Sequence, residues 1–93
     1  MSSKLYVLVE AGLSPSQQAV QAAHGVAQYC LDHPDTSWRN GTIVLLKVPE
    51  LEAYVKDHDL GRHAVFREPD AGDLLTAVVG MDFKRITRML PMV

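Results

Sequence analysis

The chain has little of several residue types, and each shortage excludes a class of protein. It has a single cysteine, Cys30, so it cannot form an internal disulfide, and we expect it in a reducing, cytoplasmic compartment. No apolar run approaches the roughly 20 residues of a membrane-spanning helix. Basic residues are not in excess, because nine Lys and Arg stand against eleven Asp and Glu, a formal net charge of −2. That balance argues against a protein held to nucleic acid by bulk charge, although a local basic patch stays open.

What remains is the composition of one globular domain. The 93 residues are 47% hydrophobic and 22% charged, which excludes a disordered tail. This length predicts a single domain over residues 1–93. Apolar segments alternate with segments of helical pattern. They predict strands at 4–10, 42–48, 63–67 and 74–79, and helices at 15–32, 49–56 and 83–90.

The order of these elements, β-α-β-α-β-β-α, indicates the fold class. Strands that are apolar on both faces need helices on both sides, which predicts a three-layer α/β/α domain. The link between the third and fourth strands, residues 68–73, is too short for a crossover helix. Those two strands are therefore expected to be antiparallel, and the four-stranded sheet to be mixed.

The first helix carries the most informative pattern. Ser14 is a good N-cap, Pro15 suits the first helical position, and Gln17 completes a capping box. At about 100° per residue, one narrow polar stripe runs beside a broad apolar arc; the stripe holds Gln17, Gln21, His24 and Gln28. Two interpretations stay open. The stripe is a solvated helix face, or it is the polar wall of a cleft, where amides bind a substrate and the imidazole takes a proton near pH 7.

The start of this helix is a second candidate contact. It follows the first strand directly, so it lies at the edge where open α/β sheets bind ligands. Free N–H groups and the helix dipole there favour an anion such as phosphate, which Ser14 and Ser16 can assist. The Gly12 turn is not a phosphate-binding motif. Cys30, on the apolar arc, is expected to be a core thiol, and Asp57, His58, Asp59 and His63 fit no zinc spacing.

A charged loop follows the third predicted strand. Arg67, Glu68, Asp70 and Asp73 crowd a tight bend that Pro69 and Gly72 shape. One interpretation is a solvated loop whose charges pair locally. The other makes Asp70 a site carboxylate that orients a histidine or activates a water. Thr76 lies in the next, otherwise apolar strand, where it either bonds the backbone or donates to a substrate.

Three of these segments together resemble the type II peptidyl-tRNA hydrolases, most of all the short bacterial and phage-like members or relatives. Gln21-Ala22-Ala23-His24 is similar to the family's helix signature, Asp70-Ala71-Gly72 to its D-A-G loop, and Thr76 to Gly80 to its closing strand. The resemblance covers nearly the whole chain in order, including the opening strand KLYVLVE. The chain departs from it in two places: Ser16-Gln17 replaces a Gly-Lys pair, and only Asp73-Leu74-Leu75 replaces a longer T-Q loop.

The resemblance implies a fold, an activity and a site. It implies a mixed four-stranded sheet between helices, often dimeric, and cleavage of the ester between a stalled peptide and the 3′ ribose of tRNA without metal or cofactor. Gln21, His24, Asp70 and Thr76 inherit the catalytic site. His24, or Asp70 through His24, would deprotonate a water. Substrate contacts are expected from the first helix and a basic patch; they are Ser14, Ser16, Gln17, Arg62, Arg67, Lys84, Arg85 and Arg88.

Two further hypotheses remain beside the hydrolase. The lysine-to-glutamine departure at Gln17 suggests a catalytically silent relative, which would act as a tRNA-binding, small-ligand-binding or dimerisation module. The third is a small-molecule regulatory domain that uses the same cleft. All three depend on one spatial expectation, that the amide-and-imidazole stripe of the first helix and the acidic bend enclose a common pocket.

Overall fold

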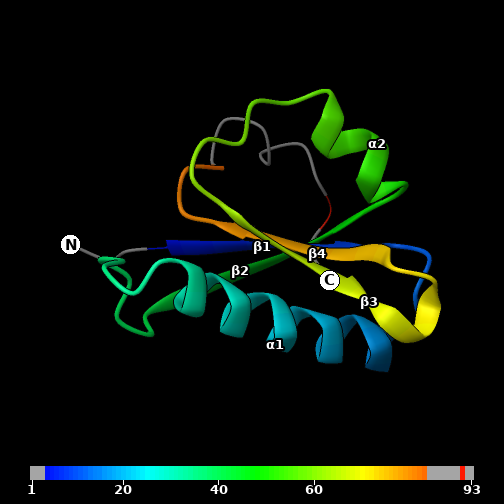
Figure 1. Ribbon diagram of the computed structural model, residues 1–93, viewed down its shortest axis with the longest axis horizontal. Helices are drawn as coiled ribbons and strands as arrows, with labels where there is room; N and C mark the ends of the chain where they lie inside the picture. Colours follow the sequence, from blue (N-terminus) through cyan, green and yellow to red (C-terminus); the bar gives the residue numbers. More distant parts are fainter. Residues whose placement is uncertain (1–3, 84–90, 92–93) are drawn as a thin grey trace.

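The computed structural model describes residues 4–83 and 91, and it contains a four-stranded mixed sheet with helices on both sides (Figure 1). The strand order is β2-β1-β4-β3, with β1 parallel to β2 and the other neighbours antiparallel. The predicted mixed sheet and the antiparallel third and fourth strands are confirmed. The elements are β1 (Lys4–Glu10), α1 (Pro15–Asp32), β2 (Thr42–Val48), α2 (Leu51–Lys56), β3 (Ala64–Glu68), the 3-10 turn η1 (Pro69–Ala71) and β4 (Leu74–Gly80).

The central strands β1 and β4 are buried on both faces, whereas the edge strand β2, which is also apolar on both faces, is partly exposed, with Ile43 at 47%. On the α1 side, Leu5, Val7 and Val9 of β1 join a cluster that includes Tyr29. On the α2 side, Leu8 packs in a second cluster that also holds residues of α2 and β4; its other members are Tyr6, Leu46, Val48, Leu51, Leu60, Leu75, Val78 and Phe83. Figure 1 shows α1 and α2 on opposite faces. The last predicted helix, residues 83–90, lies outside the described residues except for Phe83. Among the helices that the structure describes, none is long and apolar enough to span a membrane.

The orientation of α1 differs from the one that its apolar arc suggests. Its buried residues are Gln18, Gln21, Gly25 and Tyr29, whereas Leu31 is 75% exposed and Cys30 is also exposed. The expectation of a core thiol at Cys30 is therefore wrong. The helix turns this face to the sheet because Gly25 allows a close approach and because two buried amides find partners there.

A β-bulge interrupts the pairing of β3 with β4. Phe66 pairs with Ala77 and Arg67 pairs with Leu75, so the register passes over Thr76. A bulged residue leaves the alternation of the strand, which re-aims its side chain. The chain then turns through η1, and Gly72 and Asp73 follow with left-handed φ angles of 65° and 60°. The tight bend predicted from Pro69 and Gly72 is confirmed.

Candidate functional site

Three polar side chains from α1, β3 and β4 form one hydrogen-bonded chain. The Thr76 hydroxyl donates to Gln21 Oε1 at 2.7 Å, and Gln21 Nε2 donates to Glu68 Oε2 at 2.8 Å. Gln21 is 7% exposed and Thr76 is 1% exposed. These two contacts fix which end of the Gln21 amide faces which partner. An amide nitrogen has two hydrogens, and Glu68 takes one of them.

The bulge explains why Thr76 can reach α1. By simple alternation Thr76 would share the α2-facing side of Val78, which belongs to the cluster on that side. Its contact with Gln21 places its hydroxyl on the α1 side instead. The same hydroxyl lies 3.3 Å from the Phe66 carbonyl. Its one hydrogen is therefore used inside the protein, and Thr76 can influence a substrate only by holding Gln21.

His24 lies one helical turn beyond Gln21 and is exposed. Its ring stacks on Phe66 of β3, with 4.5 Å between the ring centroids and an interplanar angle of 6°. One ring face is thus covered, while neither ring nitrogen has a hydrogen-bond partner among the described residues. An imidazole held in this way can take a proton from a water at its edge.

The acidic bend adjoins this helix edge, and the contact runs through Glu68. The backbone N–H of Asp70 donates to Glu68 Oε1 at 3.3 Å, while Gln21 donates to the other carboxylate oxygen. The polar stripe of α1 and the bend therefore adjoin through Glu68, whereas a common pocket between them stays a prediction. The Asp70 side chain itself is exposed and has no partner among the described residues.

The charge state of Glu68 follows from these contacts. The Gln21 amide, helped by the Asp70 backbone N–H, holds the pKa of the Glu68 carboxyl below its ordinary value of 4.5. Partial burial opposes this shift, and the charge of His24 adds to it. Glu68 is therefore a carboxylate at neutral pH, and its electric field reaches His24.

Many of the hydrogen-bonding groups at the start of α1 already bond to one another within the helix cap. The Gln17 N–H donates to Ser14 Oγ at 3.3 Å, and the Ser14 N–H donates to Gln17 Oε1 at 3.2 Å, so the predicted capping box is confirmed. Ser16 Oγ lies 3.4 Å from Ser14 Oγ. Pro15 has no N–H. Few donors therefore remain here for an anion.

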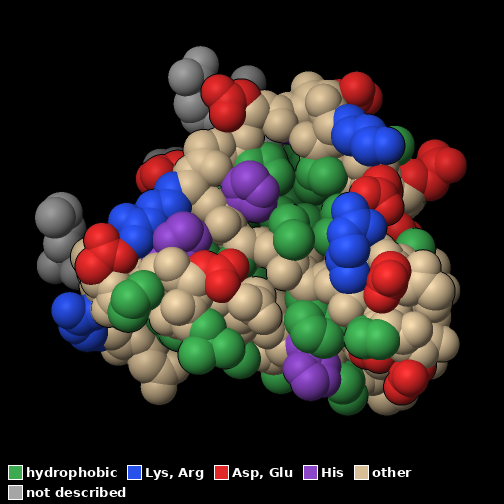
Figure 2. Space-filling view, in the orientation of Figure 1, with side chains coloured by type: hydrophobic (Ala, Val, Ile, Leu, Met, Phe, Trp, Pro, Cys, Tyr) green, Lys and Arg blue, Asp and Glu red, His purple; other side chains and the backbone are tan. Residues whose placement is uncertain are grey.

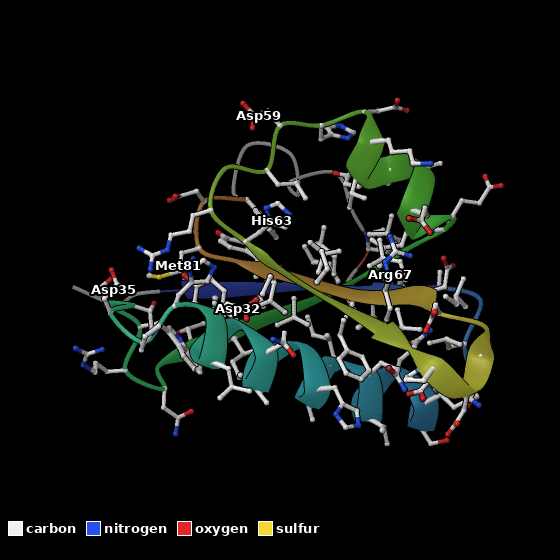
Figure 3. All side chains as sticks on the ribbon, viewed as in Figure 1. Asp32, Asp35, Asp59, His63, Arg67 and Met81 are labelled. Atoms are coloured by element: carbon white, nitrogen blue, oxygen red, sulfur yellow. The ribbon has the colours of Figure 1, made fainter. Side chains whose placement is uncertain are left out.

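Of the basic residues predicted to contact RNA, the two that the structure describes, Arg62 and Arg67, point away from the cluster. Arg67 points to the α2 side of the sheet (Figure 3), where its guanidinium donates to both Glu52 oxygens at 3.1 and 2.5 Å. Arg62 is paired with Asp35 at the other end of the sheet. On the face in Figure 2, cationic and anionic side chains are interspersed. Lys84, Arg85 and Arg88 lie outside the described residues.

Glu68 is the site residue that the sequence reasoning missed. The sequence presents it as one of four charged residues in the loop, without an assigned role. A signal was present, because Phe66 and Glu68 are two residues apart on a strand and so share one face. A carboxylate on a face that a helix covers needs a donor from that helix, and the amide stripe of α1 offers one.

The structure also has cavities outside this cluster. A groove of about 380 Å³ runs between α1 and β2, and its lining is apolar; it includes Ala22, Ala23, Val26, Ala27, Ile43 and Leu45. A second cavity, of about 290 Å³, lies by Arg62 and Met81. Within residues 4–83 and 91, no cluster of three or more His, Cys, Asp or Glu side chains has the geometry to hold a metal ion.

No protein-family model matches the chain, and no curated protein sequence matches it. Membership of the type II peptidyl-tRNA hydrolases is therefore a proposal that depends on the motifs and on the site geometry.

Proposed function

We propose that this protein hydrolyses the ester between a peptide, or an N-blocked amino acid, and the 3′ ribose of tRNA. The observation that carries the proposal is the hydrogen-bonded chain Thr76–Gln21–Glu68 beside the stacked His24. Gln21 and Thr76 are 55 residues apart in sequence, yet both belong to the motifs of the resemblance. Their direct contact supports a shared role.

The proposed reaction assigns one task to each group of the site. His24 takes a proton from a water, whose oxygen attacks the ester carbonyl carbon. Gln21 Nε2 donates its second hydrogen to the carbonyl oxygen as negative charge develops on that oxygen. The bond from carbon to the ribose oxygen then breaks, and the imidazolium returns its proton to that oxygen. Thr76 positions Gln21, and Asp70 lies at the rim of the site.

Turnover of N-blocked aminoacyl-tRNA tests the proposal directly. We expect the intact chain to release deacylated tRNA in the absence of added metal. The rate at low substrate should fall about tenfold between 50 and 200 mM salt, as two to three phosphate contacts with single-stranded RNA would require. Release is measured on acidic gels against a no-protein control. No release above that control, at any salt concentration, would reject the hydrolase.

The second candidate is a silent relative that binds tRNA without turnover. Gln17 favours it, because this position has a lysine in the family that the chain resembles, and here the side chain is part of the helix cap. Fluorescence polarisation with labelled tRNA separates the two. Micromolar binding without product supports the binding module.

Replacement of Gln17 by lysine tests whether a missing cation limits the rate. Gln17 is one turn before Gln21, so an ammonium there would face the developing negative charge. We expect kcat/KM to rise at least about tenfold, which corresponds to about 1.4 kcal/mol. The variant should also melt a few degrees lower, since the bond from the Ser14 N–H is lost. Gln17→Met loses the same bond without gaining charge, so equal kcat/KM values for both variants would contradict the prediction.

Homodimer formation, which the resemblance also implies, belongs to the same proposal. Apolar side chains on α1 and β2 are exposed, among them Val20 at 53% and Ile43 at 47%. Exposed apolar surface of this kind is typical of interaction sites. It supports a dimer, and light scattering of the intact chain at several concentrations tests it.

A further inference from the structure

We propose that Glu68 is the positioning carboxylate of this site, in the place that the resemblance gives to Asp70. This inference rests on the proposed function. Each oxygen of the Glu68 carboxylate has its own partner, because Oε2 accepts from Gln21 at 2.8 Å and Oε1 accepts from the Asp70 backbone at 3.3 Å. One side chain therefore joins α1 to the beginning of the bend.

Two contacts fix α1 against β3 in one register. Gln21 meets Glu68, and His24 meets Phe66. Residues three apart on a helix are separated by about 4.5 Å along its axis, and residues two apart on a strand by about 6.7 Å. The two contacts are therefore adjacent, and the Glu68 carboxylate lies within about one helical turn of the imidazole.

Glu68 is also the charged group that faces His24. On α1, the other charged residue is Asp32, two turns beyond His24. On β3, Arg67 points to the opposite face and pairs with Glu52. β4 presents uncharged side chains to α1, and the Asp70 carboxylate, on η1, is exposed to solvent.

This placement gives Glu68 two tasks in the proposed reaction. It accepts one hydrogen of Gln21 Nε2, which leaves the other available to a substrate. Its negative charge also stabilises the imidazolium that forms when His24 takes the proton from water. Neither task requires Glu68 to touch the substrate, so it acts through Gln21 and His24.

The side-chain amide signals of Gln21 in the ¹⁵N-labelled intact chain test the inference without any turnover. We expect these signals to move as pH is lowered, with a midpoint below 4.5, because protonation of Glu68 weakens its bond to Gln21. Glu68→Gln should abolish this movement, and Asp70→Asn should keep it. Glu50→Gln, at an exposed carboxylate directly before α2, is the matched control and should also keep it. Loss of the movement in Asp70→Asn, or its survival in Glu68→Gln, overturns the inference. The backbone spectrum of each variant reports whether it has folded.

Kinetics supply the second readout. Glu68→Gln should lower kcat about tenfold, the loss expected for one charge-assisted contact, with tRNA affinity unchanged. An unchanged kcat in Glu68→Gln would overturn the role of Glu68 in the reaction. If the unmodified chain releases no tRNA, the proposed function fails, while the Gln21 signals still decide whether Glu68 holds the amide.

Discussion

Replacement of His24 by phenylalanine is expected to lower the rate of tRNA release about 10²- to 10⁴-fold, the contribution typical of a general base. The phenyl ring can keep the stack on Phe66, which has a centroid distance of 4.5 Å in the native protein, but it cannot accept a proton. His24→Ala removes both the stack and the proton acceptor and should lose at least as much. The measurement is single-turnover release of tRNA at saturating protein, which separates chemistry from binding.

The comparison between these two variants decides what His24 does. If His24→Phe retains the native rate while His24→Ala loses it, the ring serves as a stacking surface and another group activates the water. His63→Ala is the matched control, because His63 is also exposed but lies away from the cluster (Figure 3), where its Nδ1 is 2.8 Å from the Gly61 carbonyl. It should release tRNA at the native rate. If His63→Ala loses as much activity as His24→Phe, the loss in His24→Phe cannot be assigned to the site, because replacing any exposed histidine would lower the rate.

The sequence was enough to predict the strands and helices from β1 to β4 and their order along the chain. Strand alternation, the Ser14–Gln17 capping box and the short link after β3 are local features, and local physics decides them. The adjacency of the helix edge and the acidic bend was also predictable, since the motifs of the resemblance needed it. The structure confirms that adjacency through the two contacts of Glu68.

The side of the sheet to which the Thr76 side chain points was not predictable from the sequence. In a regular strand it would point to the α2 side with Val78, away from Gln21. The bulge that reverses it comes from the pairing of β3 with β4, in which Arg67 is opposite Leu75. No residue in the LLTAVV segment is of a type that predicts a bulge. The face that α1 turns to the sheet was not predictable either. Apolar periodicity favours the face with Val20 and Cys30, whereas close contact with β4 selects the face with Gly25.

Gly25→Val is expected to lower the free energy of unfolding by about 3 kcal/mol, a large share of the stability of a small domain. A Cβ atom at position 25 would lie 2.9 Å from both the Ala77 Cβ and the Val79 Cγ2. Ala77 has no side-chain torsion with which to move away, so the helix itself must shift from the sheet. Urea unfolding followed by circular dichroism measures the loss, and an unchanged slope with denaturant would confirm that the same structure unfolds.

Ala27→Val is the matched control, because Ala27 is on the same helix but exposed. It should lose only the few tenths of a kcal/mol that valine costs in a helix. Gly25→Ala should fall between the two, since the better helix propensity of alanine, about 1 kcal/mol, offsets part of the clash. Equal stability of Gly25→Val and Ala27→Val would contradict the close approach of α1 to β4.

The same approach of helix to sheet links stability to the site. Gly25 is one turn beyond Gln21, so a helix pushed off Ala77 and Val79 also carries Gln21 away from Thr76, which it now meets at 2.7 Å. Gly25→Ala, which should remain folded, is therefore expected to lower kcat for tRNA release as well as stability. Val79→Ala removes one of the two clashing atoms, so the double variant should recover part of both losses beyond simple additivity. Recovery of stability without recovery of kcat would mean that the contact between Gln21 and Thr76 does not govern the reaction.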